Sequence, residues 1–439
     1  MINKFKAPIN PEIPDFEFPQ FEKILINEDI TLYAVHDDFQ PLVSFTVLFP
    51  LGANSEKNAG ISYFSSQMLK RGTKKRSSSQ IAEEFDKLGA SLNISSDWDY
   101  TKAGFTCLGN YFSDCIEILS DCIYNSNFSD DEIERLKTKH LADIEQETAD
   151  PSYTADISLS KGVFGNHPYG HPMIGTKRSI KTIENIDCLS WYDELLSSEK
   201  INIVVSGTFK IEQVIKLVHK NFKVKAEENK HSKKLILFDK NIENKIIIKN
   251  KRDSEQTHLR IGKLTISRNN PDFPAYQFAN TVFGGFFLSR LNKLLREELG
   301  YTYGVSSYIN SKKLASISVV STSINKDASA DTVKKVLEQM NLMKNEKISE
   351  EEYILVRRYL LGSFVRGIET SRQIAGLVRN QIVAELSDDY YTNFYNRIKE
   401  LTIDEIFDCQ KKYFSTSGLV ITAVGDKKLL EKSLDNTLF

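Results

Sequence analysis

The two halves of this chain end on the same kind of sequence. Residues 201–208 read Ile-Asn-Ile-Val-Val-Ser-Gly-Thr, residues 418–426 read Gly-Leu-Val-Ile-Thr-Ala-Val-Gly-Asp, and a short charged helical pattern follows each segment. A strand, turn and helix that recur at the close of each half predict one structural module used twice. The length of 439 residues, which is enough for two to three domains, agrees with this prediction.

The elements predicted within each half follow a similar order. Segments rich in β-branched and aromatic residues come first, and amphipathic helical patterns follow them. In the first half we expect strands at 30–35, 42–49 and 201–208, and helices around 81–88 and 112–123, from Ser129 with a capping-box signature, and at 211–222. In the second half we expect strands at 245–249 and 258–265, a hairpin around 302–322 and the closing strand, with helices from Phe273 and at 333–343, 350–364 and 373–386.

Strands and helices alternate here without the strict rhythm of a doubly wound parallel sheet. We therefore expect an α+β fold in which helices cover a mostly antiparallel sheet in each of two sister domains. The polar, charged stretch 225–234 is the best candidate for a linker. The predicted organisation is an N-terminal extension, a first domain, a linker and a second domain at 1–19, 20–224, 225–240 and 241–439.

The charge balance and the cysteines restrict the partners and the compartment. Lys plus Arg number 57 and Asp plus Glu number 59, which argues against nucleic acid or an anionic membrane as the main partner. No apolar run approaches the roughly 18 residues that span a bilayer, and the N-terminus has no apolar segment of a secretory signal. The cysteines are odd in number and form no CxxC, so we expect buried, reduced thiols and a cytoplasmic protein: Cys107, Cys115, Cys122, Cys188 and Cys409.

Residues 49–77 carry the pattern with the most functional information. They contain a Gly-Ala-Asn-Ser-Glu turn, a helix that begins after Gly60, and a Lys-Arg-Gly-Thr exit. This order resembles the signature region of the pitrilysin/insulinase zinc-metallopeptidase family, in which the helix carries His-x-x-Glu-His. In that motif two histidines one turn apart bind Zn²⁺, and the Glu takes a proton from the zinc-bound water.

In this chain the three motif positions hold Tyr63, Ser66 and Gln67. Neutral phenol, hydroxyl and amide oxygens are poor zinc ligands, and none of them replaces a carboxylate base. The family takes a further ligand from a later helix, and the acids of that region are more simply interpreted as a solvated helix face: Asp143, Glu145 and Glu147. We therefore expect no metal to be bound by this chain alone.

The second half keeps the second signature of the same family. Residues 283–307 contain a Gly-Gly turn, Ser-Arg-Leu, a helix with Leu-Arg, and a Gly-Tyr-Thr-Tyr-Gly run. The resemblance implies that Arg296 and Tyr303 contact the substrate near the scissile carbonyl, from the domain that faces the zinc. Guanidinium and phenol groups are donors suited to a developing oxyanion. Taken without the surrounding signature, the two residues would simply be a surface helix residue and a half-buried strand residue.

Three other features have simpler interpretations. His167 and His171 are four residues apart, but a proline and a glycine lie between them, so we expect a structural loop, of a kind that many family members share. His258 lies in a predicted strand and should pack or form a hydrogen bond. The basic run 70–76 coincides with the helix exit of the family signature, which favours a solvated turn over a nucleic-acid site.

The resemblance implies a fold and a role. The family's active unit is a clam-shell of four sister domains, which smaller members build from two chains. A chain that lacks the zinc triad but keeps Arg296 and Tyr303 fits the partner role: it would pair with a homologous zinc-bearing chain and orient peptides for hydrolysis at the zinc of that chain. Peptide would be held in part by strand addition at a sheet edge. The alternative is a proteolytically inactive scaffold subunit of the same fold.

Overall fold

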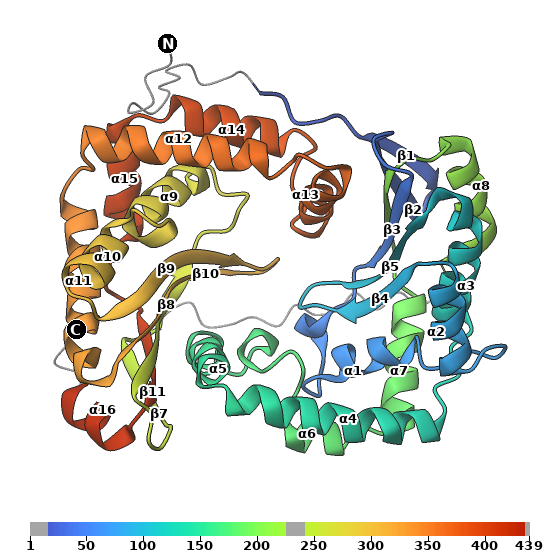
Figure 1. Cartoon of the computed structure of the whole chain (residues 1–439), viewed down its shortest axis with the longest axis horizontal. Helices are drawn as coiled ribbons and strands as arrows, with labels where there is room; N and C mark the ends of the chain where they lie inside the picture. Colours follow the sequence, from blue (N-terminus) through green and yellow to red (C-terminus); the bar gives the residue numbers. More distant parts are fainter. Residues whose placement is uncertain (1–15, 225–241, 435–439) are drawn as a thin grey trace, which may run out of the picture.

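The computed structural model describes residues 16–224 and 242–434, and each half of the chain forms one β-sheet (Figure 1). The strands of the first sheet are β1 (Glu22–Asn27), β2 (Ile30–His36), β3 (Leu42–Phe49), β4 (Ser91–Ser96), β5 (Thr101–Leu108) and β6 (Ile201–Gly207). Those of the second sheet are β7 (Lys245–Asn250), β8 (Gln256–Thr265), β9 (Thr302–Ser311), β10 (Ser316–Asn325) and β11 (Val420–Gly425). The predicted linker at 225–240 lies outside the described residues.

The two sheets have the same strand order once β1 is set aside. The orders are β1-β2-β6-β3-β5-β4 and β7-β11-β8-β10-β9. Among the strands of the described residues, the only parallel neighbours are β2 with β6 and β7 with β11, and these pairs hold equivalent places. Because β6 and β11 are the closing strands of the two halves, the predicted repeat of one module is confirmed. The α+β class with mostly antiparallel sheets is confirmed as well.

Helices surround the two sheets (Figure 1). The helices of the first half are α1 (Ile61–Met68), α2 (Ser78–Lys87), α3 (Phe112–Tyr124), α4 (Asp130–Ala149), α5 (Pro151–Phe164), α6 (Lys177–Lys181), α7 (Asn185–Leu196) and α8 (Ile211–Asn221), with short turns η1 (Ala53–Ser55), η2 (Gly109–Tyr111) and η3 (Pro168–Gly170). Those of the second half are α9 (Phe273–Asn280), α10 (Arg290–Asn292), α11 (Ser329–Asn345), α12 (Glu350–Arg366), α13 (Ser371–Val383), α14 (Tyr390–Glu400), α15 (Ile403–Tyr413) and α16 (Lys427–Ser433), with the π-helical turns η4 (Thr281–Gly285) and η5 (Lys293–Glu298) and the turn η6 (Lys326–Ala328).

One helix ends earlier than the sequence predicts, and another lacks its predicted cap. The helix expected to reach residue 386 ends at Val383, because Glu385 adopts a left-handed φ of 52° that stops the helix. Helix α4 begins after Ser129 as expected, but the predicted capping box is wrong, since the Ser129 side chain makes no capping bond. The Glu132 carboxylate, which the box requires, instead pairs with Arg135 at 2.9 Å and Arg71 at 3.7 Å.

The two halves exchange a helix. Helix α5 belongs to the first half but packs on β8 and β11 of the second sheet. Its Gly162 allows the closest approach, since a Cβ there would lie 2.5 Å from Val420 Cγ1. Buried Arg260 of β8 fixes the same helix through a charge-assisted bond from Nε to Asp156 Oδ1 of 2.6 Å.

Helix α13 makes the reciprocal contact, because it belongs to the second half but packs on β2 and β6 of the first sheet. Its buried residues Ala375 and Val378 share one apolar cluster with Tyr33 and Val204 of that sheet. The described end of the predicted N-terminal extension follows the same path, since Phe18 joins this cluster and its ring lies 5.2 Å from that of Tyr391. Each sheet therefore packs against helices of its own half and against one helix that belongs to the other half.

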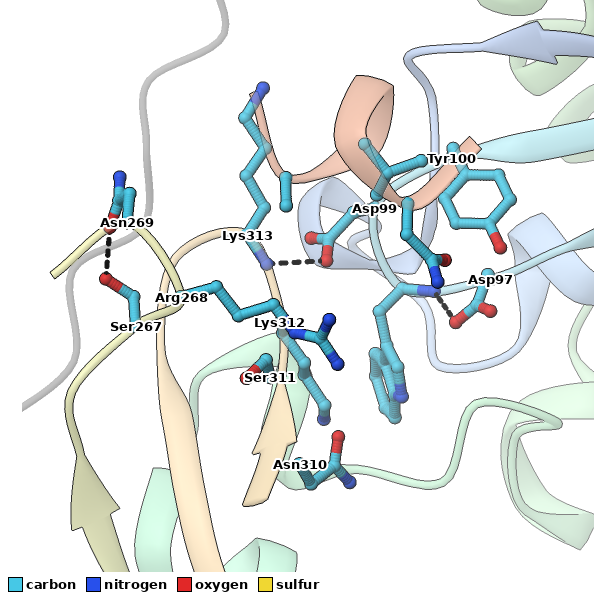
Figure 2. Close-up of a pocket in the computed structure, with 14 residues that line it drawn as sticks. Asp97, Asp99, Tyr100, Ser267, Arg268, Asn269, Asn310, Ser311, Lys312 and Lys313 are labelled. Carbon is cyan, nitrogen blue, oxygen red and sulfur yellow. Dashed lines mark hydrogen bonds between the residues drawn. The ribbon is translucent and has the colours of Figure 1, made fainter. Parts of the chain in front are cut away.

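A third junction is formed by the β9–β10 hairpin tip, which reaches the β4–β5 turn of the first half beside a cavity of about 250 Å³ (Figure 2). The ammonium of Lys312 lies 3.9 Å from the ring centre of Trp98 and 4.6 Å from that of Tyr169. The Lys313 backbone N–H donates to Asp99 Oδ2 at 2.8 Å, and the Tyr169 hydroxyl donates to the other oxygen of the same carboxylate. Burial lowers the pKa of Lys312 to about 8.

Candidate functional site

The helix that corresponds to the first signature, α1, is held at its start by a buried carboxylate. Glu56 accepts hydrogen bonds from the backbone N–H groups of Gly60 at 2.7 Å and Ser62 at 3.0 Å, which would otherwise lack partners. Gly60 has φ of 90°, a conformation that favours glycine, so the chain can turn into the helix there. Burial raises the pKa of Glu56 to about 7, and His171 Nε2 lies 3.5 Å from its Oε1.

The three degenerate positions lie on α1, and each side chain has a structural contact. The ring of half-buried Tyr63 stacks on His140 of α4 at 5.4 Å between centroids. Ser66 is fully buried, and its hydroxyl donates to Tyr63 O at 2.7 Å and accepts from Ser96 N at 3.0 Å. Gln67 Nε2 donates to Ile94 O at 2.8 Å. Ser66 and Gln67 therefore join α1 to strand β4.

These contacts do not fit the zinc that the sequence resemblance implies. The Ser66 and Gln67 groups are already bonded to the protein, and burial, together with nearby Asp143 and Glu147, raises the pKa of the Tyr63 phenol and so disfavours a phenolate ligand. His140 lies beside the Tyr63 ring, and its Nε2 lies 2.7 Å from the Ile174 carbonyl. Within residues 16–224 and 242–434, no cluster of three or more His, Cys, Asp or Glu side chains is placed to hold a metal ion.

The acids on α4 have the placement that the sequence predicts. Asp143, Glu145 and Glu147 are exposed, and Glu145 pairs with Lys177 at 3.2 Å. Asp143 and Glu147 are close enough to Tyr63 to act on its pKa, so α4 keeps its place beside α1 although the ligand set is lost.

Arg296 and Tyr303 lie in the second half, on η5 and β9, two elements that pack against each other. The Arg296 guanidinium stacks 4.0 Å from the ring centre of Phe287, and its buried Nη1 has no hydrogen-bond partner among the described residues. Tyr303 is 93% exposed, and Phe287 beside the arginine is 61% exposed. The alternative interpretation of Tyr303 as a half-buried strand residue is therefore wrong, and the Tyr303 and Phe287 side chains are both exposed.

The two sets of candidate residues remain in separate halves. Tyr63, Ser66 and Gln67 are on α1, whereas Arg296 and Tyr303 are at the edge of the second sheet, and no hydrogen bond or ring contact in the described part of the chain joins them. Within one chain they do not form a single catalytic constellation.

The remaining candidates have mainly structural contacts. His258 of β8 bonds through Nδ1 to Ser323 Oγ at 2.9 Å, as expected for a strand residue. His167 Nδ1 accepts from the Tyr169 N–H at 3.1 Å in the short turn η3, so no regular helix forms there. The basic run is only partly solvated, because Arg76 bonds Asp121 at 2.7 Å while Lys74 and Lys75 are exposed. The five cysteines are buried free thiols.

Sequence reasoning missed Glu56, His140 and the bonds from α1 to β4. Glu56 could have been recognised, because a Glu four residues before a glycine that precedes a helix is a usable signal. The role of His140 and the bonds to β4 could not, because they depend on which strand and helix lie beside α1. No helix in the described residues is long and apolar enough to cross a membrane.

Two family models match the chain. The model described as insulinase (peptidase family M16) matches residues 32–177, and the model described as peptidase M16 inactive domain matches residues 183–360. Among curated proteins, the chain is 24% identical over 382 residues to the non-peptidase homolog YmxG of Helicobacter pylori, covering 86% of this chain and 87% of that protein. It is 24% identical over 315 residues to the uncharacterized zinc protease YmxG of Bacillus subtilis, covering 71% and 75%.

Solved structures share the fold. The crystal structure of a peptidase M16 inactive domain from Pseudomonas fluorescens has a TM-score of 0.83 at 21% identity, over 93% of this chain and 98% of that one. A protease from Helicobacter pylori has a TM-score of 0.86 at 15% identity, over 93% and 100%. A chain of complex III2 from Candida albicans has a TM-score of 0.77 at 17% identity, over 95% and 98%.

Proposed function

We propose, from the premise that this chain belongs to the M16 (insulinase) peptidase family, that it is the non-catalytic subunit of a two-chain zinc peptidase. The partner would be a homologous chain with an intact His-x-x-Glu-His motif, and zinc would be bound only there. This chain would contribute Arg296 and Tyr303 to substrate binding. The heterodimer and a cytoplasmic location are parts of the proposal that rest on the sequence.

The observation that carries the proposal is the absence of a structural use for the Arg296 and Tyr303 polar groups. A phenol on a side chain that is 93% exposed adds little to the stability of the fold. The Arg296 guanidinium is held in place by the Phe287 ring, yet its buried Nη1 has no hydrogen-bond partner in the described chain. A positioned donor without an acceptor is costly unless something supplies the acceptor, and a peptide carbonyl oxygen that gains negative charge during hydrolysis would supply it.

Both residues would act as hydrogen-bond donors. The cation–π contact fixes the guanidinium plane, so its N–H groups keep a defined direction, and the buried Nη1 would be uncovered when it meets a substrate oxygen. Tyr303 would donate its phenol hydrogen to the same region of the peptide. These interactions would be stronger with the developing oxyanion than with the neutral carbonyl, so they would affect turnover more than substrate binding.

The test mixes purified chain with its zinc-bearing homologue and measures cleavage of a quenched fluorogenic peptide. We expect no cleavage by this chain alone, cleavage by the mixture, and a roughly 10²–10³-fold lower kcat with Arg296→Ala. Arg358→Ala, at an exposed position of α12, and Tyr308→Phe, on the same strand as Tyr303, are matched controls that should leave kcat unchanged. Cleavage and stoichiometric zinc in the isolated chain would refute the proposal.

A second candidate role, an inactive structural subunit, is favoured by the similarity to a chain of complex III2 from Candida albicans. A structural subunit would copurify with unrelated proteins rather than with a chain that carries His-x-x-Glu-His. It would also leave the mixture inactive with every variant above.

A further inference from the structure

The outer edge of the first sheet is partly covered by the residues that replace the zinc motif. Strand β4 is the last strand of that sheet, with β5 as its only neighbour among the described strands. An edge strand of this kind presents backbone N–H and C=O groups to an added strand.

The phase of the β4–β5 ladder identifies the groups that point outward. Asp97 N donates to Tyr100 O at 2.7 Å, so this pair is hydrogen-bonded, and the next pair, Ser96 with Thr101, is not. Hydrogen-bonded and non-hydrogen-bonded pairs alternate along an antiparallel ladder, so Ile94, like Ser96, belongs to a non-hydrogen-bonded pair. The backbone groups of Ile94 and Ser96 therefore point away from β5.

These outward groups are the ones that α1 occupies. Gln67 Nε2 donates to Ile94 O at 2.8 Å, and Ser66 Oγ accepts from Ser96 N at 3.0 Å. Ile94 and Ser96 are both buried, so water does not compete strongly for either bond. The two side chains satisfy one acceptor and one donor that an incoming extended peptide would need.

The second half shows the same arrangement at its own edge strand. On β9, Asn292 accepts from Val305 N at 3.1 Å and donates to Val305 O at 2.7 Å, and Asn280 Nδ2 donates to Ser307 O at 3.0 Å. Lys312 N bonds to Ala315 O at 2.9 Å, and the ladder phase again directs the groups of Val305 and Ser307 outward. In both halves, then, side chains from neighbouring helices cover the edge of the sheet.

We infer that Ser66 and Gln67 act as an internal substitute for a bound peptide, so that the first half of this chain does not take an extended polypeptide by strand addition at Ile94–Ser96. The replacement of the zinc motif would thus have two effects: it removes the metal ligands, and it closes the neighbouring peptide edge. This inference does not depend on the roles proposed for Arg296 and Tyr303. It places any strand addition in the proposed heterodimer on the partner chain.

The test removes the two side-chain contacts with little change in volume. Gln67→Glu keeps the length of the side chain but replaces the donor to Ile94 O with an acceptor, and Ser66→Ala removes the hydroxyl. Ser65→Ala is the matched control, because Ser65 is equally buried on α1 but its hydroxyl makes no hydrogen bond to β4. Thermal unfolding confirms that each variant is folded before binding is measured.

The probe is a fluorescein-labelled ten-residue peptide of alternating Thr and Val with one Lys at each end, followed by fluorescence anisotropy. A second peptide with alternate backbone N-methyl groups cannot form the edge hydrogen bonds. We expect at least tenfold tighter binding of the first peptide to the Ser66→Ala/Gln67→Glu variant than to the wild type or Ser65→Ala, and no gain for the methylated peptide.

Amide hydrogen exchange gives an independent readout in the same proteins. The Ser96 N–H should be protected in the wild type and in Ser65→Ala, and should exchange at least tenfold faster in the double variant without peptide. Equal binding of the unmethylated peptide to wild type and double variant would overturn the inference. Unchanged Ser96 exchange in the double variant would overturn it as well.

Discussion

The packing of α5, a helix of the first half, on the sheet of the second half can be tested by adding one methyl group at Gly162. In Gly162→Ala the new Cβ would lie 2.5 Å from Val420 Cγ1 and 2.9 Å from Ile247 Cδ1, both on the second sheet. Val420 is fully buried, so its side chain has no free space to move into. Overpacking of this kind costs about 1–3 kcal/mol, against a gain of up to about 1 kcal/mol for replacing glycine within a helix. With the full propensity gain, the net expectation is a loss of about 0–2 kcal/mol.

Gly362→Ala is the matched control, because Gly362 is also within a helix, α12, but no atom lies within 4 Å of its would-be Cβ. Only the propensity gain applies there, so the free energy of unfolding should rise by about 0.5–1 kcal/mol. Urea unfolding followed by far-UV circular dichroism compares the two variants under identical conditions. If Gly162→Ala were as stable as Gly362→Ala, α5 would not pack on the second sheet, and the described exchange would be wrong.

Two further predictions concern pH and have opposite signs. Burial raises the pKa of Glu56 from 4.5 to about 7, so the native state holds this proton more tightly than the unfolded chain, and the free energy of unfolding should fall as pH rises from about 4.5 to 7; Glu56→Gln should remove that fall in a series of urea titrations. Burial lowers the pKa of Lys312 from 10.5 to about 8, so stability should rise as pH increases from about 8 to 10.5, and this rise should be lost in Lys312→Met but kept in the neighbouring control Lys313→Met.

Much of the fold could be predicted because local patterns specify it. Strand β3 matches the predicted 42–49 at both ends, since Val43, Phe45 and Val47 alternate toward one core. The closing strands β6 and β11 were recognisable because they are buried runs of β-branched residues with a glycine at the end. The partner of each helix was not predictable in this way. The apolar residues of α5 and α13 indicate a buried face, but not that the face packs against the sheet of the other half.

The same distinction applies to the candidate site: its residue types could be predicted from the sequence, and its tertiary contacts could not. The replacement of the zinc motif by Tyr63, Ser66 and Gln67 can be read directly from residue types, because metal binding depends on the ligand side chains. The edge contacts could not be read, because their partners are backbone atoms of Ile94 and Ser96 in a strand with weak strand composition, Ser-Leu-Asn-Ile-Ser-Ser. A backbone atom leaves no signal in the sequence that would assign it a partner.

The loss of the metal site and the covered edge follow from the same geometry. A side chain at position 66 or 67 lies beside β4 because α1 packs on that strand, so it can either face a ligand or bond to the strand. A Glu or His that binds metal or activates water has to leave the strand groups free, whereas a short hydroxyl and a primary amide match a backbone N–H and C=O. On the inference drawn above, Ser66 and Gln67 give the buried edge of β4 the hydrogen bonds that a bound peptide would otherwise supply, and these bonds stabilise the contact between α1 and β4.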